Sequence, residues 1–370
     1  MCDTKNSVHA RYIMQKFCEG LKSGIFDDDS FELVNDYNDI AKIKSCNVSF
    51  QTCTNNFSLK NKTDLNWKLK SSSWRKKGDT SNQYHLDGSI NYTSLRYSII
   101  KHINDYGVVP IVAEAGYIGH IKWLDFGSGR SNPGDIYESY VSLGVGGIKR
   151  DAMYFNNNMP KDRYRKLHKK IKSEPLEWRK DGTFILILGQ NPLGVGTTNI
   201  RKMGYSYEDW MIKTIKDIQK HTDRPIVYKP HPYMVKNRNT YSMWKKGNKL
   251  ANFIQSGEGV CHISPHKNIK DSLRDCWCVV TSASNASIDA VWYGVPVLTQ
   301  DPMSMVYDIS SNNISEVEYP YLHDDMCQFF YDLCYAQWKP EEIASGEAWS
   351  HIREGIINEN LLSKFKKEAE

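Results

Sequence analysis

The clearest hydrophobic pattern in the chain lies between residues 276 and 301. An apolar run at 276–280 is short and bounded like a buried strand. Small polar residues follow it, and from Ser284 apolar residues recur at helical spacing until Gly294, a C-cap candidate. A second apolar run follows at 295–298. The stretch therefore predicts a βαβ unit whose helix begins, with free backbone N–H groups, at the carboxyl end of a strand.

The same alternation of apolar runs and amphipathic stretches extends over much of the chain. The pattern predicts strands at 108–113, 140–143, 184–188, 225–228 and 259–263, and helices at 92–106, 164–171, 207–221, 326–338 and 356–367. Strands that alternate with helices predict an α/β fold built on parallel sheets, with functional loops at the carboxyl edge of the strands.

Length and composition narrow the class of protein. A chain of 370 residues can form two domains with separate cores. No apolar run approaches the roughly 20 residues of a membrane-spanning helix, and the polar N-terminus does not resemble a signal peptide. The nine cysteines are scattered without a C-x-x-C pair. We therefore expect a cytoplasmic protein with no membrane contact and no metal.

The order of the elements predicts the domain organisation. We expect a first domain at 1–160, a basic inter-domain connection at 161–182, a second domain at 183–340 and a terminal helical segment at 341–370. Three asparagines and Pro160 come just before the connection.

Two basic stretches are candidates for contact with a polyanion, and the net charge of +5 permits such a partner. The segment 161–172 carries seven cations and one anion, and the loop 67–77 mixes two tryptophans with five basic residues. The candidate nucleic-acid-binding residues are Trp67, Lys70, Trp74, Arg75, Lys76, Arg163, Arg165, Lys166, Lys169 and Lys170. The alternatives are a solvated helix face and a loop whose tryptophans pack beneath it.

Polar loops follow several predicted strands of the second half. The first, 189–196, is neither a P-loop nor a dinucleotide fingerprint, because it lacks Gly-Lys-Ser/Thr and a third glycine. Candidate ligand-binding residues on these loops are Gln190, Asn191, Lys229, His231, Thr281, Ser282, Ser284 and Asn285. Lys229 and His231 offer a positive charge and a hydrogen-bond donor to a phosphate, although either can instead stabilise its own loop.

Two carboxylates of the first half are candidates for acid–base chemistry. Glu114 directly follows a buried strand, and Asp151 follows a glycine cluster at 144–147. A carboxylate at the end of such a strand is placed to reach a ligand. Alternatively, Glu114 caps the next turn or pairs with a lysine.

The segments K-P-H-P at 229–232 and T-S-A-S-N-A-S-I-D-A-V-W-Y-G-V-P-V at 281–297 resemble the donor half of GT-B glycosyltransferases. The likeness is to bacterial capsule and lipopolysaccharide Kdo transferases and to related phage DNA glycosyltransferases. It implies two Rossmann-like domains facing a central cleft and a C-terminal helix that crosses back to the first domain. It also implies that Asp289, five residues before Gly294, binds the nucleotide ribose. Glu114-Ala-Gly-Tyr-Ile resembles an acceptor-side segment of the family.

The resemblance and the basic stretches together predict a phage-type enzyme that moves a sugar from a UDP-sugar to a hydroxymethylated pyrimidine in double-stranded DNA. UDP-sugar would be a co-substrate, with no cofactor or metal, and the enzyme would act as a monomer. Glu114 is the first choice for the catalytic base and Asp151 the second; a retaining enzyme would instead use the carboxylate as nucleophile or stabiliser. The alternatives are transfer to a capsular or lipopolysaccharide glycan and a non-catalytic protein that binds nucleic acid or a nucleotide sugar.

Overall fold

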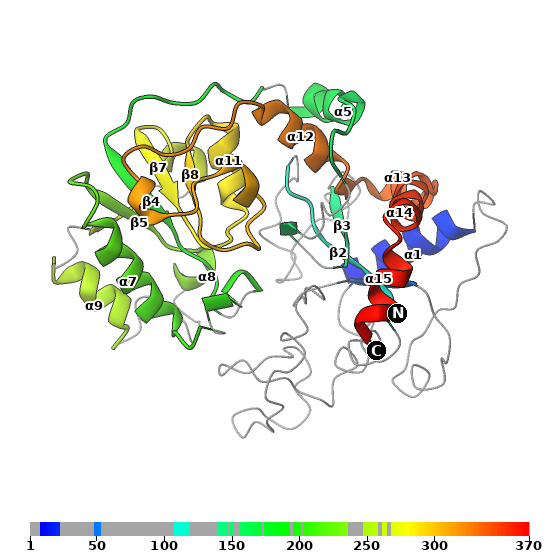
Figure 1. Cartoon of the computed structure of the whole chain (residues 1–370), viewed down its shortest axis with the longest axis horizontal. Coiled ribbons are helices and arrows are strands. Elements are labelled where there is room, and N and C mark those ends of the chain that lie inside the picture. The colour runs from blue at the N-terminus through cyan, green and yellow to red at the C-terminus, as the bar shows by residue number, and fades with distance from the viewer. Residues whose placement is uncertain are drawn as a thin grey trace, which may run out of the picture. The chain divides into compact units, whose positions relative to one another are not determined.

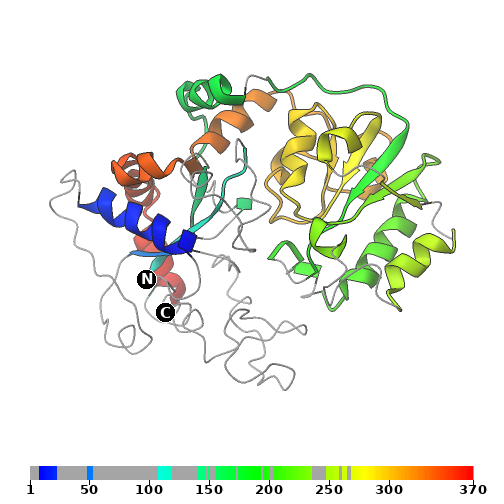
Figure 2. The ribbon, with the colours of Figure 1, turned by 180° about the vertical axis from the view of Figure 1, so that it is seen from behind.

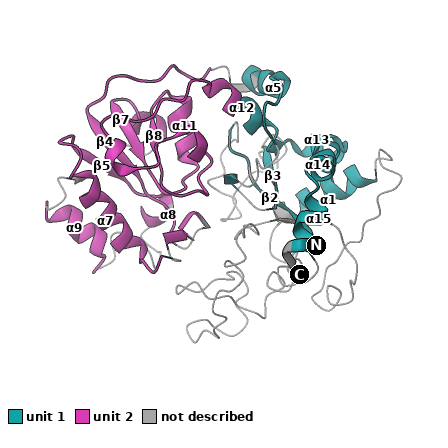
Figure 3. Cartoon of the chain, viewed as in Figure 1, with its two compact units in different colours: residues 1–171, 330–370 teal, residues 172–329 magenta. Residues whose placement is uncertain are grey.

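The computed structural model divides the chain into two compact units, residues 1–171 with 330–370 and residues 172–329 (Figure 3). The residues that it describes are 8–22, 48–52, 107–118, 140–146, 149–150, 156–171, 174–192, 195–197, 199–200, 203–235, 247–257, 261–264 and 268–369. The predicted helix at 92–106 lies outside the described residues. Among those described, no helix combines the length and apolar character needed to cross a membrane.

The second unit is built on a five-stranded sheet in which every pair is parallel, as the alternation predicted. Its strands are β4 (Phe184–Leu188), β5 (Ile226–Lys229), β6 (Cys261–Ile263), β7 (Cys276–Val280) and β8 (Val297–Leu298). They lie in the order β6-β5-β4-β7-β8. β4 is therefore the central strand, with β5 and β6 added on one side of it and β7 and β8 on the other, which is the arrangement of a doubly wound fold.

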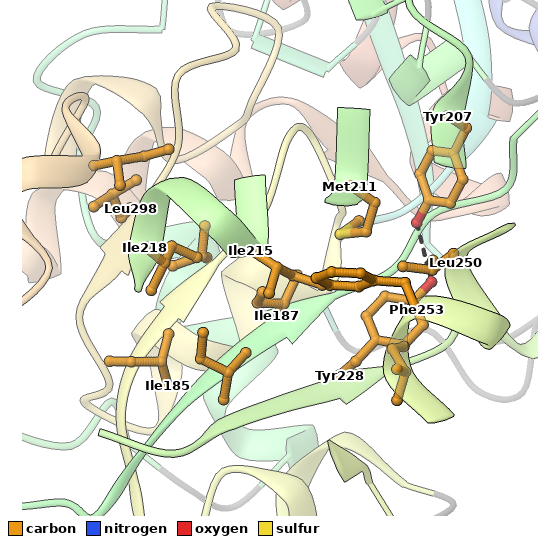
Figure 4. Close-up of a cluster of buried hydrophobic side chains, with 14 of the residues drawn as sticks. Ile185, Ile187, Tyr207, Met211, Ile215, Ile218, Tyr228, Leu250, Phe253 and Leu298 are labelled. Atoms are coloured by element: carbon orange, nitrogen blue, oxygen red, sulfur yellow. Dashed lines mark hydrogen bonds between the residues drawn. The ribbon is translucent and has the colours of Figure 1, made fainter. Parts of the chain in front are cut away.

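Helices cover both faces of this sheet (Figures 1 and 2). They are α7 (Tyr207–Ile218), α8 (Pro232–Val235), α9 (Lys249–Gln255), α10 (Ile269–Ser272) and α11 (Ala286–Trp292), with short 3-10 turns at η4 (Val195–Thr197), η5 (Tyr307–Ile309) and η6 (Ile314–Glu316). The side chains of α7 and α9 pack on Ile185, Ile187 and Tyr228 (Figure 4). Because successive side chains of a strand face opposite ways, Leu186 and Leu188 are buried on the other face.

The helix α11 ends at the glycine that the sequence marked as its cap. Gly294 has a φ of 68°, in the left-handed region that favours glycine. A Cβ atom there would lie 2.0 Å from the carbonyl oxygen of Glu177. The segment 176–179 also hydrogen-bonds to this helix end, because Leu176 N–H donates to Trp292 O and Arg179 N–H to Gly294 O. Glycine is therefore required both for the turn and for the close packing of this segment.

The first unit contains a four-stranded mixed sheet in the order β1-β2-β3-β9. Its strands are β1 (Val48–Thr52), β2 (Val109–Ala115), β3 (Val141–Val145) and β9 (Gln337–Trp338). β1 is parallel to β2, whereas the β2/β3 and β3/β9 pairs are antiparallel, a direction that the hydrophobic pattern did not predict. The helices are α1 (Val8–Leu21), α5 (Asp162–Ile171), α13 (Pro340–Ala344), α14 (Glu347–Asn358) and α15 (Leu361–Ala369). The helix α12 (Met326–Cys334) begins in the second unit and ends in the first, since the division falls between residues 329 and 330.

The C-terminal part of the chain packs within the first unit. One face of the sheet, with Ile111, Leu143 and Trp338, shares a core with side chains of α1, α13 and α14. Two predicted helices are shorter than expected. The stretch 326–338 is helical only as far as Cys334 and then forms β9, and the stretch 356–367 is interrupted at Asn360, which has a φ of 51°.

The division into units differs from the predicted one at the basic segment. Residues 161–171 were expected in an inter-domain connection, but α5 belongs to the first unit. The cause is Arg163, which is 4% exposed and lies 3.7 Å from the ring centroid of Trp338. Its guanidinium donates to Glu342 at 2.9 and 3.1 Å and to the carbonyls of Cys334 and Gln337, each at 2.9 Å. The prediction that Arg163 contacts nucleic acid is therefore wrong.

We expect Arg163→Met to lower the free energy of unfolding of the first unit by about 3–5 kcal/mol, because it removes the guanidinium that pairs with the Glu342 carboxylate and bonds to two buried carbonyls. Arg165→Met is the matched control, since Arg165 is exposed on the same helix and its replacement is expected to change stability by less than about 0.5 kcal/mol. Urea denaturation followed by circular dichroism measures both. Equal losses in the two variants would contradict the assigned role of Arg163.

Candidate functional site

The candidate site of the second unit lies at the carboxyl edge of its sheet, where the loops after β4 and β7 adjoin. These two neighbouring strands flank the point at which the strand order reverses, which is where doubly wound sheets bind ligands. The Thr281 hydroxyl donates to Leu188 O at 3.4 Å, and the Ser282 hydroxyl lies 3.3 Å from Gly196 O. The structure thus brings two predicted polar loops into direct contact.

A buried carboxylate, that of Asp301, connects these loops. Asp301 is 7% exposed and follows β8. One oxygen accepts a hydrogen bond from Ser282 Oγ at 2.7 Å, and the other accepts from Asn199 Nδ2 at 2.6 Å and from Met303 N at 3.0 Å. Thr299 Oγ1 donates to the carbonyl of Ser282. Both carboxylate oxygens are therefore satisfied, and the loops after β4, β7 and β8 are held together.

Gln190 occupies the base of the loop after β4. Gln190 is 5% exposed, and its amide packs closely against Gly196, where a Cβ atom would lie 2.1 Å from Gln190 Oε1. The backbone N–H of Gln190 donates to the Tyr207 hydroxyl at 2.8 Å. The Tyr207 hydroxyl oxygen also lies 3.2 Å from the Tyr228 hydroxyl oxygen (Figure 4). Asn191, the next candidate, is half-buried, and its carbonyl lies 3.4 Å from Thr197 Oγ1.

Lys229 is the last residue of β5 and His231 follows it, on the side of β4 away from β7. Both side chains are half-buried. Burial lowers the pKa of Lys229, and the negative charge of Asp271 opposes this shift. The backbone fixes the loop, because Gly189 N–H donates to Lys229 O at 2.8 Å and Met234 N–H to His231 O at 2.8 Å. Lys229 thus offers a partly desolvated cation at the same sheet edge.

The turn after β7 differs in one respect from its prediction. We expected free backbone N–H groups at the start of α11, but Ser287 N–H donates to Ser284 O and Ile288 N–H to Asn285 O, each at 3.0 Å. Thr281 and Ser282 are buried and their hydroxyls bond to protein groups. Ser284 and Asn285 are half-buried, and Asn285 is the N-cap residue but forms no side-chain capping bond. Side chains rather than backbone amides would therefore meet a ligand here.

Asp289, the predicted ribose-binding residue, lies in the first turn of α11. Burial raises the pKa of its carboxyl group to about 7. Tyr293, four residues further along the chain, has a raised pKa because of its own burial and the nearby Asp289 charge. The raised pKa of Asp289 results from removal of water around its carboxyl group. Hydroxyl groups of a ligand that donate hydrogen bonds to this carboxylate would favour its charged form.

Glu114 is the candidate carboxylate of the first unit. It lies on β2, on the face opposite to Ile111 and Ala113, whose side chains belong to the core. Its Oε2 atom is buried and makes no hydrogen bond to any described residue. Burial raises the pKa of Glu114, and the charge of Lys149 opposes the shift. The second candidate, Asp151, lies outside the described residues.

Apart from the buried Arg163, the predicted nucleic-acid-binding residues fall into two groups. Arg165, Lys166 and Lys169 are exposed on α5, which also contains Lys170. Lys166 Nζ lies 3.7 Å from Glu347 Oε1, so part of the charge of this helix is neutralised. The candidates of the loop 67–77, namely Trp67, Lys70, Trp74, Arg75 and Lys76, lie outside the described residues.

Sequence reasoning missed two residues that shape the site. Asp301 ends the stretch 276–301 of the sequence analysis but received no role there, although an acidic residue just after an apolar strand was the signal used for Glu114. Tyr207 has no local signal, because its hydroxyl is directed by tertiary packing; burial raises its pKa to about 12. Within the described residues, no three His, Cys, Asp or Glu side chains gather as a metal site would require.

Comparisons with known proteins find a distant likeness of structure. No family model matches the chain, and no curated protein matches it. The structure of Thermosulfurimonas dismutans KpsC, beta Kdo 2,4 transferase, is 15% identical, with a TM-score of 0.43 over 66% of this chain and 77% of that chain. The beta Kdo 2,7 transferase of the same KpsC is 16% identical, with a TM-score of 0.35 over 65% of this chain and 78% of that chain. At these TM-scores the likeness assigns neither substrate nor site residues.

Proposed function

We propose that the protein is a glycosyltransferase that uses a nucleotide-activated sugar. The observation that carries the proposal is the carboxyl edge of the parallel sheet, where Asp301 holds together the loops that carry Gln190 and Ser284. These loops adjoin at the strand-order reversal, the usual position of a nucleotide in such a sheet. Asp289, with its raised pKa, is the proposed acceptor of hydrogen bonds from the ribose.

The proposed reaction follows from the groups available. The acceptor hydroxyl oxygen attacks the anomeric carbon of the donor, the bond from that carbon to the diphosphate breaks, and the nucleoside diphosphate leaves with the electron pair. Lys229, Ser284 and Asn285 are the proposed partners of the growing negative charge. Glu114 is the proposed base that takes the hydroxyl proton, since its buried Oε2 atom has no hydrogen bond to a described residue.

The proposed acceptor is DNA that carries a hydroxymethylated pyrimidine. Exposed cations of α5, with Arg165 and Lys169 among them, support a polyanionic partner. The second candidate is a capsular or lipopolysaccharide glycan. It is favoured by the burial of Arg163 and by the pairing of Lys166 with Glu347, which leave α5 less basic than its sequence suggests.

An acceptor panel distinguishes these candidates. The full chain is incubated with UDP-sugars and either hydroxymethylated duplex DNA or oligosaccharides, and the products are analysed by mass spectrometry. We expect the mass of one added sugar on the modified nucleoside. We also expect Arg165→Gln with Lys169→Gln to reduce the salt slope of DNA binding by about 1.8, at about 0.9 for each lost phosphate contact. Transfer to a glycan and not to DNA would contradict the DNA assignment.

We expect Glu114→Gln to lower the rate of sugar transfer by about 100-fold or more, because the amide cannot take the proton of the acceptor hydroxyl. Binding of the UDP-sugar is expected to stay unchanged, since the proposed donor residues belong to the second unit. Steady-state kinetics and isothermal titration calorimetry measure the two quantities. An unchanged rate of transfer in Glu114→Gln would contradict the role of Glu114 as the base. Absence of transfer by the parent protein would favour a non-catalytic binding role.

We expect the affinity for a UDP-sugar to rise with pH through about 7. The carboxyl group of Asp289 has a pKa of about 7, and only its charged form accepts both ribose hydroxyl protons; below that pH the affinity falls by up to about tenfold per pH unit. The diphosphate of a UDP-sugar keeps its charge over this range. Asp289→Asn is therefore expected to bind more weakly at pH 8 and to lose the dependence between pH 6 and 8. Calorimetric titration at several pH values measures this, and a pH dependence that persists in the variant would contradict the role of Asp289.

A further inference from the structure

A buried glutamine from the C-terminal part of the chain lies in the same row of the first unit's sheet as Glu114. In the register of the strands, Glu114 is opposite Ser142, and Ser142 is opposite Gln337 of β9. Residues opposite each other in antiparallel strands present their side chains on the same face. Glu114 and Gln337 therefore share the face opposite to the core that contains Trp338.

The side chain of Gln337 bonds to the backbone that directly follows Glu114. Gln337 Oε1 accepts hydrogen bonds from Tyr117 N at 2.7 Å and from Ile118 N at 2.9 Å. Gln337 Nε2 donates to Ile118 O at 2.9 Å. The residue is 1% exposed, so these bonds are shielded from water. The amide thus serves three backbone groups that lie beyond the end of β2.

The backbone around Glu114 is held on both sides. The strand β2, which contains Glu114, pairs with β3 as far as Ala115. The next residue, Gly116, donates its backbone N–H to Tyr140 O at 3.0 Å. Beyond that point, the next two residues are bonded by Gln337. Packing leaves little freedom here, because a Cβ atom at Gly116 would lie 2.7 Å from Tyr140 O.

This backbone restraint matters because the Glu114 side chain has little anchor of its own. Its Oε2 atom is buried without a hydrogen bond to any described residue. A carboxylate that is to act on a bound group must be held within a fraction of an ångström of its productive position. With no hydrogen bond to a described residue at Oε2, the carboxylate depends more on the backbone position of Glu114, which sets the region that the side chain can reach.

We propose that Gln337 is a positioning residue for Glu114, acting through the backbone of Tyr117 and Ile118. The catalytic part of this proposal rests on the proposed function, in which Glu114 is the base. Arg163 extends the arrangement, because its guanidinium donates to the Gln337 carbonyl at 2.9 Å and so holds β9 in turn.

The test replaces Gln337 by methionine, which has a similar volume but cannot make the three hydrogen bonds. Two readouts are taken on the full chain: the pH titration of the Glu114 carboxyl carbon by NMR, with Glu114→Gln identifying its signal, and the kcat and donor KM of sugar transfer. We expect the titration midpoint of Glu114 to fall by at least about 0.5 pH unit as water reaches the loosened segment. We expect kcat to fall at least about tenfold with the donor KM unchanged.

Ile352→Ala is the matched control for destabilisation. Ile352 is 1% exposed in the core on the other face of the same sheet, so its truncation weakens the unit without removing a bond to residues 116–118. We expect the control to leave the Glu114 midpoint and kcat unchanged at a temperature where both variants are folded. An unchanged midpoint in Gln337→Met, or an equal change in Ile352→Ala, would overturn the proposal.

The two readouts separate this proposal from the proposed function. If the parent protein transfers no sugar, the proposed function fails, whereas the titration still decides whether Gln337 controls the surroundings of Glu114. If transfer occurs and Glu114→Gln abolishes it, but Gln337→Met changes neither kcat nor the midpoint, only the positioning role fails.

Discussion

The hydrogen bonds accepted by the Asp301 carboxylate are the constraint on which the candidate donor site depends. A buried carboxylate keeps its negative charge at low cost only when donors satisfy its oxygens, and here the donors come from Ser282, Asn199 and the backbone of Met303. Each donor belongs to a different loop. Satisfying one charge therefore brings together three loops that the parallel sheet alone would only place near one another.

The first unit uses the same principle with groups from its C-terminal part. Arg163 on α5 is satisfied by Glu342 and by two carbonyls, and Gln337 satisfies three backbone groups after β2. In both cases a buried polar side chain completes the hydrogen bonding of backbone groups far away in the chain: Arg163 bonds to carbonyls at the end of α12 and in β9, and Gln337 to groups beyond the end of β2. Long-range polar contacts thus define the irregular segments, whereas the apolar cores define the sheets.

The behaviour of Arg163 shows why charge patterns are weaker guides than apolar ones. In sequence it is one of seven cations in a basic helix, and a solvated or nucleic-acid-facing position is the natural expectation. In the structure it is buried because a guanidinium can stack on Trp338 while its nitrogen atoms bond to oxygens in the plane. Arg165 on the same helix has the same sequence signal and is exposed.

The sequence by itself determined the strands of the parallel sheet, the polar turns after them and the capping role of Gly294, because these follow from periodicity and backbone preference over a few neighbouring residues. Only the tertiary structure decided which strands are antiparallel, which hydroxyls are consumed within the protein and which side chains hold the loops. Those partners are far apart in the chain, 102 residues for Asn199 and Asp301 and 220 for Tyr117 and Gln337. No local pattern encodes such pairs, since they form only when separate elements pack and bury them together.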